Sequence, residues 1–192
     1  WRNISGTSVA SLTSNTNYPN SPTSSSVITT IDAPRDFADN YGQRIRGYLA
    51  PTVTGNYKFW ISSDDDSELW LSTTSSPANK VKIASLTGWT YPEDYDKSSS
   101  QASANIALTA GNYYYIEALH KEADGGDHVT VAWQAPGGSR VTIPNANLVT
   151  APPVPLPAPG SFSQTAPAAG ATGVTLSPTF TWGSSSDAAT YT

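Results

Sequence analysis

The sequence predicts an all-β protein, built as an antiparallel β-sandwich or barrel, over most of its 192 residues. Two observations carry this prediction. Hydrophobic and polar residues alternate with period two in short segments, and Gly, Pro, Asn or Asp residues separate those segments. No amphipathic helical pattern lies between them, although the crossovers of a parallel sheet would need one. We therefore expect antiparallel strands joined by turns.

The strand pattern begins near residue 43. In QRIRGYLA, hydrophobic Ile45 and Leu49 alternate with charged Arg44 and Arg46. Residues 1–36 are rich in Ser, Thr, Asn and Pro and predict short extended pieces and turns, without a helix. The predicted strands are QRIRGYLA (43–50), YKFWISS (57–63), ELWLS (68–72), KVKIASL (80–86), NIALT (105–109), YYYIEALHKE (113–122), HVTVAWQ (128–134) and RVTIP (140–144).

Composition narrows the classes of partner. There are 10 Lys and Arg against 15 Asp and Glu, giving a formal charge of -5, and no basic cluster suits a phosphate backbone, so nucleic acid is not an expected partner. No apolar run is long enough to span a membrane, so we expect no membrane insertion. The chain has no Cys, so its compartment cannot be read from redox chemistry. Only 13% of residues are charged. Together with the abundance of Ser, Thr, Asn, Gly and Pro, this favours an extracellular protein, either secreted or on a cell surface.

The sequence changes character at residue 151. APPVPLPAPG (151–160) contains five prolines and predicts an extended, semi-rigid linker. Residues 1–150 would then form one domain. Residues 161–192 contain a strand-like PTFTW and resemble the opening strands of a fibronectin type III or similar immunoglobulin-like repeat, cut too short to build a core of its own. Other domains of a parent chain are therefore expected partners.

Two acidic connections are the strongest chemical signal. SSDDDSELWLS (62–72) and HKEADGGDH (120–128) each follow an aromatic strand, and hairpin connections alternate between the ends of a sandwich, so both loops can lie at one end. Calcium takes six to eight oxygen ligands in flexible geometry, whereas zinc would need more His or Cys than the two His present. The alternative is that these loops are solvated turns. The oxygen donors on offer are Asp64, Asp65, Glu122, Asp124, Asp127 and the carbonyls of Gly125 and Gly126, with Asp94 and Asp96 as a minor alternative pair.

The same stretches resemble a known family. GQRIRGYLAPTVTGNYKFWISSDDDSELWLS, PANKVKIASLTGWT and GNYYYIEALHKEADGGDHVTVAWQAPGG are similar to the domain named for a bacterial toxin's protective antigen, the PA-fourteen domain, and the resemblance covers about residues 1–150. It implies a β-sandwich or barrel which, in fungal flocculins, bacterial adhesins and glycosidases, often binds carbohydrate through calcium.

The resemblance also implies a ligand set. In lectin members two adjacent aspartates joined by a cis peptide hold the ion, and sugar hydroxyls complete its coordination. By position the pair is Asp64 and Asp65, after Ser63; Asp66 stands where the family usually has Gly, so Asp65 and Asp66 form an alternative pair. From the second acidic loop, the implied ligands are Asp127, Asp124 and the backbone of Gly125 and Gly126.

An aromatic wall for a sugar is expected from the loop LTGWTYPEDYDKSSS. Its candidates are Trp89, Tyr91 and Tyr95, and His128 is a candidate to line the site. Alternatively, Trp89 packs beneath the loop, and His120 and His128 are ordinary surface residues. Trp60, Trp70 and Trp133 lie within predicted strands, and we expect them to pack in the core or between sheets.

The resulting hypothesis is a calcium-dependent carbohydrate-binding, lectin-like module of a larger extracellular protein, with a glycan or polysaccharide as partner and Ca²⁺ as cofactor. The alternative is a non-catalytic protein-interaction or spacer domain. Enzymatic activity is not expected, because adjacent aspartates cannot flank a scissile glycosidic bond from opposite sides. No Ser-His-Asp or Cys-His set is legible either.

Overall fold

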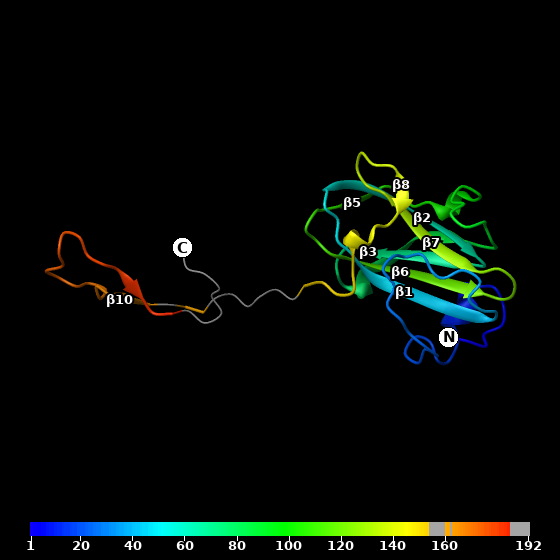
Figure 1. The fold of residues 1–192 in the computed structure, drawn as a ribbon, viewed down its shortest axis with the longest axis horizontal. Helices are drawn as coiled ribbons and strands as arrows, with labels where there is room; N and C mark the ends of the chain where they lie inside the picture. The colour runs from blue at the N-terminus through cyan, green and yellow to red at the C-terminus, as the bar shows by residue number, and fades with distance from the viewer. Residues whose placement is uncertain (154–159, 162, 185–192) are drawn as a thin grey trace. The chain divides into compact units, whose positions relative to one another are not determined.

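A computed structural model describes residues 1–153, 160–161 and 163–184 (Figure 1). The chain divides into two compact units, Trp1–Pro152 and Pro153–Thr192. The first unit contains two antiparallel sheets packed on each other, which confirms the predicted all-β antiparallel fold.

The larger sheet has five strands in the order β4-β3-β6-β1-β9, and the smaller has four in the order β5-β2-β7-β8. All eight predicted segments form strands, and β9 is an addition that the sequence pattern did not reveal. The first sheet comprises β1 (Tyr41–Leu49), β3 (Ser67–Ser72), β4 (Lys80–Leu86), β6 (Tyr114–Glu122) and β9 (Leu148–Val149). The second comprises β2 (Gly55–Asp64), β5 (Ile106–Leu108), β7 (His128–Gln134) and β8 (Arg140–Thr142).

The core lies between the two sheets and follows the period-two alternation. Phe59 and Ile61 of β2 face Leu69 of β3 and Ile116 of β6, and all four side chains are fully buried. Burying each such side chain contributes about 1.5–3 kcal/mol relative to its exposed state. The inward-facing row of β6 continues beyond this apolar core, so His120 and Glu122 also point inward, at one end of the sandwich.

The strand tryptophans have three different environments. Trp133 packs in the main core with Tyr57 and Phe59, and Trp60 is buried in a separate small cluster with Tyr95, as expected for both. The prediction is wrong for Trp70, which is only half-buried and lies outside both clusters. Its outward position in β3 places its ring under the Lys80 ammonium, 5.7 Å from the ring centre.

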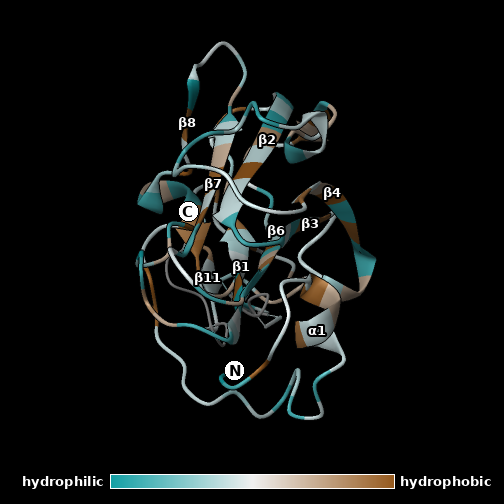
Figure 2. Ribbon diagram, turned by 90° about the vertical axis from the view of Figure 1, so that its right-hand side faces the viewer, coloured by the Kyte–Doolittle hydropathy of each residue, from teal (hydrophilic) through white to brown (hydrophobic). Residues whose placement is uncertain are grey.

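One short helix contradicts the expectation of only turns and extended pieces before residue 36. α1 (Val9–Thr13) begins after Ser8, whose side chain accepts a hydrogen bond from the Ser11 amide. Its buried Val9 and Leu12 cover the outer side of β1, and Figure 2 shows the helix at the flank of the sheets. Gly42 makes this approach possible, because a Cβ there would lie 2.7 Å from Leu12 Cδ1. The sequence did not predict this helix, because five residues span too few turns to show helical periodicity.

Three single turns of 3₁₀ helix complete the first unit: η1 (Pro77–Asn79), η2 (Ser99–Gln101) and η3 (Asn145–Asn147). None of the helices in the described part of the chain is long and apolar enough to cross a membrane.

The second unit contains β10 (Gln164–Ala166) paired with β11 (Thr181–Trp182). None of its described residues is buried, and Trp182 is 54% exposed, so residues 160–161 and 163–184 form no core. The fibronectin type III-like assignment stays a prediction. Most of the predicted proline-rich linker, residues 154–159, lies outside the described residues.

Candidate functional site

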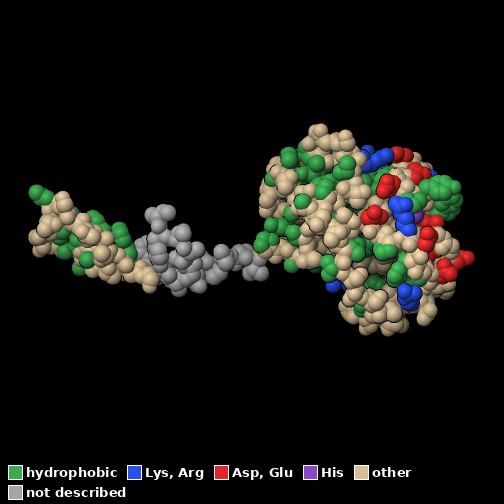
Figure 3. Space-filling view, viewed as in Figure 1, with side chains coloured by type: hydrophobic (Ala, Val, Ile, Leu, Met, Phe, Trp, Pro, Cys, Tyr) green, Lys and Arg blue, Asp and Glu red, His purple; other side chains and the backbone are tan. Residues whose placement is uncertain are grey.

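The two acidic loops lie side by side at one end of the sandwich, as predicted, although neither is a hairpin connection. Both connect one sheet to the other: the aspartates join β2 to β3, and the glycine loop joins β6 to β7. The register places Asp64 opposite His128 and Ser67 opposite His120. Figure 3 shows Asp and Glu side chains gathered on one side of the domain, with Lys and Arg among them.

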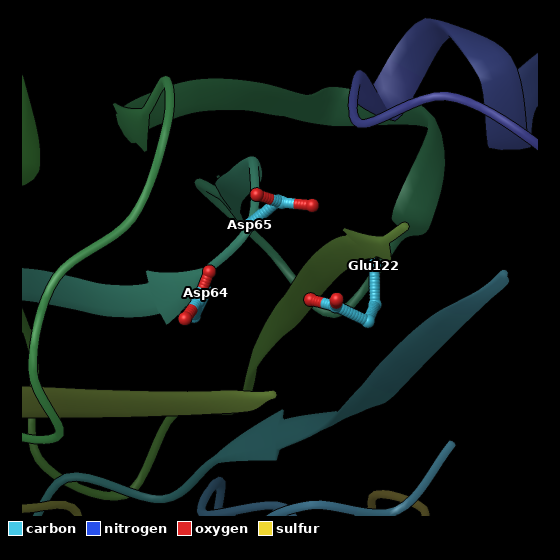
Figure 4. A group of neighbouring side chains, drawn as sticks. All are labelled: Asp64, Asp65 and Glu122. Carbon is cyan, nitrogen blue, oxygen red and sulfur yellow. The ribbon is translucent and has the colours of Figure 1, made fainter. Parts of the chain in front are cut away.

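Three carboxylates converge between these loops. Asp64, Asp65 and Glu122 each offer an oxygen, and the three oxygens lie within 4.8 Å of one another. Figure 4 shows that Asp64 and Asp65 come from the end of β2, while Glu122 reaches toward them from β6. Such close like charges repel, and a cation between them would remove that repulsion.

Glu122 supports a cation site most directly. It is fully buried, and neither of its carboxylate oxygens forms a well-aligned hydrogen bond, although a contact with the Asp65 backbone lowers its pKa slightly against the larger effects below. Burial, followed by the charges of Asp65 and Asp64, raises its pKa to about 7. Burial and the charges of Asp65 and Asp127 raise the pKa of Asp64 to about 6. A buried, unpartnered carboxylate is costly unless something pairs with it, so this donor set fits a hard cation such as calcium.

Lys121 supplies a positive charge close to these carboxylates. It is fully buried, its ammonium donates a hydrogen bond to the Glu122 carbonyl, and burial lowers its pKa. It forms no ion pair with Glu122 or Asp65, so it leaves the Glu122 oxygens without a partner.

The backbone of the aspartate pair is held by a buried histidine. The peptide bond between Asp64 and Asp65 is cis, as the family resemblance implies for the ion-binding pair. His120 Nε2–H donates to the Asp64 carbonyl at 2.6 Å, and Gln43 Nε2–H donates to His120 Nδ1 at 2.9 Å. Burial lowers the His120 pKa to about 4, so the ring is neutral at pH 7. The surface position expected for His120 is wrong, because it continues the inward row of β6.

Asp65 ties the two loops together. Its Oδ2 accepts a hydrogen bond from the Ala123 amide at 3.1 Å, and its carbonyl accepts one from the Ser63 hydroxyl at 2.7 Å. The first contact crosses from one acidic loop to the other, so the position of Asp65 is coupled to the end of β6.

Asp127 is held by residues before and at the start of β1, and its assignment as a metal ligand stays a prediction. It is buried, and its two oxygens accept hydrogen bonds from the Ala38 amide and the Tyr41 hydroxyl, each at 3.0 Å. Burial and the Asp127 charge raise the Tyr41 pKa well above its usual range. Asp127 is therefore not one of the three converging carboxylates; it anchors residues 36–41 against the glycine loop.

The sequence analysis missed residues 36–41 as part of the site. The Asp36 amide donates to the Asp127 carbonyl, and the Asn40 amide donates to the Ala123 carbonyl. The two aspartates of RDFADN were the available signal, because they add acidic residues next to the start of β1. Asp124, Gly125 and Gly126 are exposed at the tip of the glycine loop, and Asp124 is outside the converging group.

The aromatic loop after β4 borders the aspartate pair. Trp89 and Tyr91 are 47% and 71% exposed, and their rings lie 5.4 Å apart in an edge-to-face arrangement. Between them Thr90 is buried, and its amide donates to the Ser63 carbonyl at 2.8 Å. Trp89 does not pack beneath the loop.

Two other predicted sugar contacts are buried. Tyr95 is only 6% exposed because it packs on Trp60 and Ala132, so its ring is not available as a surface wall. His128 is 3% exposed, and its Nε2–H donates to the Thr90 carbonyl at 3.0 Å. His128 thus supports the aromatic loop from beneath and has no surface position.

The remaining acidic candidates have other partners. Asp66 lies outside the converging group, and its Oδ1 accepts a hydrogen bond from the Gly88 amide at 2.7 Å. Asp96 forms a two-point ion pair with Arg140 at 2.7 and 2.8 Å, which disfavours a metal pair of Asp94 and Asp96. Of the two possible aspartate pairs, Asp64 and Asp65 are the ones that converge with a third carboxylate.

Comparison with known proteins gives a family match over most of the first unit. The family model of the PA14 domain matches residues 5–147. A mouse (Mus musculus) protein named N-acetyl-beta-glucosaminyl-glycoprotein 4-beta-N-acetylgalactosaminyltransferase 1 is 39% identical over 150 residues, which is 74% of this chain and 14% of that protein. The chain thus spans about one seventh of the length of this relative.

The chain also resembles proteins of known structure. An anti-sigma factor domain-containing protein superposes with a TM-score of 0.50 and 19% identity, over 71% of this chain and 46% of its own. The Epithelial Adhesin 6 A domain from Candida glabrata, solved in complex with Galb1-3GlcNAc, has a TM-score of 0.45 and 19% identity, over 57% of this chain and 50% of its own.

Proposed function

The chain belongs to the PA14 domain family, and from that premise we propose that it is a calcium-dependent carbohydrate-binding module of a larger extracellular protein. One observation carries the proposal: the carboxylate of a buried glutamate, which has neither an ion pair nor a well-aligned hydrogen bond to offset its charge, converges with those of two aspartates at the tip of the sandwich. Family membership alone would leave open whether this member keeps an ion site.

Asp64, Asp65 and Glu122 are the proposed calcium ligands. Calcium prefers oxygen donors and tolerates irregular geometry, which suits three carboxylates contributed by two loops. The backbone carbonyls of Gly125 and Gly126 remain candidates for further calcium ligands. Asp127 organises the loops through Ala38 and Tyr41. When bound, calcium would supply a positive charge on which vicinal sugar hydroxyls can replace water.

Trp89 and Tyr91 are the proposed sugar-contacting residues. Both are exposed on a loop whose backbone is bonded to Ser63, the residue before the aspartate pair. An aromatic ring can cover the apolar face of a pyranose while the hydroxyls of the same sugar face the ion. Contacts of this kind are few, so affinity at one site would be weak and display in several copies would strengthen it.

Catalysis is not part of this proposal. The transferase activity in the name of the mouse relative belongs to a protein of which this chain matches 14%. The three converging carboxylates lie together on one side of any ligand, whereas glycoside cleavage needs two carboxyl groups flanking the scissile bond.

A glycan array tests the proposed function. The chain is screened in millimolar calcium and again with EDTA, beside Asp65→Asn as a variant with one ligand charge removed. We expect binding that is lost both on chelation and in the variant. Binding that survives EDTA would contradict the calcium dependence, and absence of binding in calcium would favour the protein-interaction or spacer alternative.

A further inference from the structure

Asp66 makes a contact at the site that is explained neither by calcium binding nor by sugar binding. It follows the proposed calcium ligands directly, yet its carboxylate lies outside the converging group and accepts the Gly88 amide at 2.7 Å. Gly88 opens the aromatic loop with a positive φ of 82°, a conformation that favours glycine. A hydrogen bond to an ionised acceptor is among the stronger ones, so it fixes the start of the loop.

The rest of the loop is held through Thr90. Its amide and hydroxyl both donate to the Ser63 carbonyl, at 2.8 and 3.1 Å, and its own carbonyl accepts His128 Nε2–H at 3.0 Å. The Tyr91 carbonyl accepts the Ser62 hydroxyl at 3.1 Å. Because Thr90 points inward, its neighbours Trp89 and Tyr91 point outward.

A cation stands at the outer side of the loop. The Lys97 ammonium lies 4.0 Å from the centre of the Trp89 ring and donates to the Trp89 carbonyl. The Thr90 amide, next to Trp89 in the chain, is bonded to the carbonyl of Ser63, which precedes the aspartate pair. The loop is therefore fixed at four successive residues: Gly88, Trp89, Thr90 and Tyr91.

We propose that Asp66 is a positioning residue that holds Trp89 and Tyr91 beside the converging carboxylates and thereby sets the affinity for the glycan, without binding calcium itself. The inference rests on the proposed function, because it assumes that the site binds a glycan. A loop ordered before binding loses less conformational entropy when the ligand arrives. Removal of the Asp66 acceptor frees the loop at Gly88 and leaves Asp64, Asp65 and Glu122 in place.

The test compares Asp66→Ala with Asp66→Asn. Both variants remove the same negative charge, so any long-range effect on calcium binding is common to them. Only the asparagine keeps an oxygen that can accept the Gly88 amide. At saturating calcium, isothermal titration with the best glycan from the array should show affinity weakened about tenfold in Asp66→Ala and close to wild type in Asp66→Asn. Calcium affinity, titrated without glycan, should be equal in the two variants.

Amide hydrogen exchange at Gly88 and Thr90 gives a readout that needs no glycan. In Asp66→Ala the Gly88 amide should exchange at least about tenfold faster than in wild type, while the asparagine variant keeps its protection. Equal glycan affinity in wild type and Asp66→Ala, or an equal loss in both variants, would overturn the positioning role. If the wild type binds no glycan, the proposed function fails separately, and unchanged exchange in Asp66→Ala still overturns the inference.

Discussion

Glu122 is the residue on which the site depends most. Its buried charge is unfavourable in the metal-free protein and is relieved either by a proton or by a cation that pairs with it. The sequence showed Glu122 as one of several oxygen donors. Period two predicts that it shares the inner face of β6 with His120, but not how far the core extends along that face. That extent decides whether the side chain meets water or protein.

Glu122→Gln should separate ion binding from fold stability. The amide keeps the shape but lacks the charge, so we expect calcium affinity to fall at least about tenfold. In EDTA at pH 8 the variant should melt at a higher temperature than wild type, because a repulsive buried charge is gone. Asp124→Asn is the matched control, since Asp124 is exposed and outside the group. Equal calcium affinity in wild type and Glu122→Gln would contradict the ligand assignment.

The carboxylates also predict how calcium binding depends on pH. Folding raises the pKa of Asp64 from 3.8 to about 6 and that of Glu122 from 4.5 to about 7. The folded protein thus holds more protons than the unfolded chain between about pH 4 and 7. Without metal, stability should fall as pH rises through that window. Calcium competes with these protons, so its affinity should be highest above pH 7 and decline as pH falls toward 6.

Calorimetric titrations at pH 5.5, 6.5 and 7.5 check this expectation. Binding near pH 6.5 should release protons, seen as a heat that changes with the ionisation enthalpy of the buffer. Calcium affinity that stays constant across the three values would mean that the raised carboxylates are not the ligands.

Asp66 occupies a position where the family resemblance leads one to expect glycine. A glycine at this position, which the resemblance leads one to expect, has no side chain to accept the Gly88 amide. The run of three aspartates therefore points in two directions: Asp64 and Asp65 converge with Glu122, and Asp66 accepts a hydrogen bond from the aromatic loop. Sequence spacing could not distinguish them, because it does not show which way each side chain turns.

At the scale of elements, the strands were predictable from the sequence, but the short helix and the packing of the loops against the sheets were not. The segments that became β1 to β8 carry the alternation that one buried face requires. α1 has five residues, and its stability comes from the contact of Leu12 with β1 across Gly42. The same limit explains Tyr95 and His128: both lie in or after polar loops, yet tertiary packing buries them.

The contact between α1 and β1 predicts non-additive stability changes. Leu12→Ala should cost about 2–5 kcal/mol for the lost burial. Gly42→Ala should cost roughly 1–3 kcal/mol, because its Cβ would lie 2.7 Å from Leu12 Cδ1. The double variant should be less destabilised than the sum by about 1 kcal/mol, since the smaller side chain makes room. Chemical denaturation of the four proteins measures this coupling, and strict additivity would show that α1 does not press on Gly42.

Across the whole molecule, calcium should act as a stabilising ligand. Extracellular modules bind calcium with Kd of about 10⁻⁴ to 10⁻³ M, and a hundredfold excess over Kd stabilises the native state by about 2.7 kcal/mol. For a domain of this size that corresponds to a rise in Tm of roughly 5–10 °C. Thermal melts over a calcium series test this, with magnesium as the control ion. A Tm that rises equally with both ions would indicate general screening of charge.

The two units should contribute unequally to that stability. All the buried residues of the described chain, and both core clusters, belong to Trp1–Pro152, whereas residues 160–161 and 163–184 bury none. A protein ending at Pro152 should therefore keep the Tm of the full chain within about 2 °C and the same calcium response. Residues 153–192 made alone should show no cooperative melt, because the described residues of this unit form no core that could oppose the conformational entropy of the chain. A large drop in Tm on truncation would show that the second unit stabilises the first, which its exposed strands give no reason to expect.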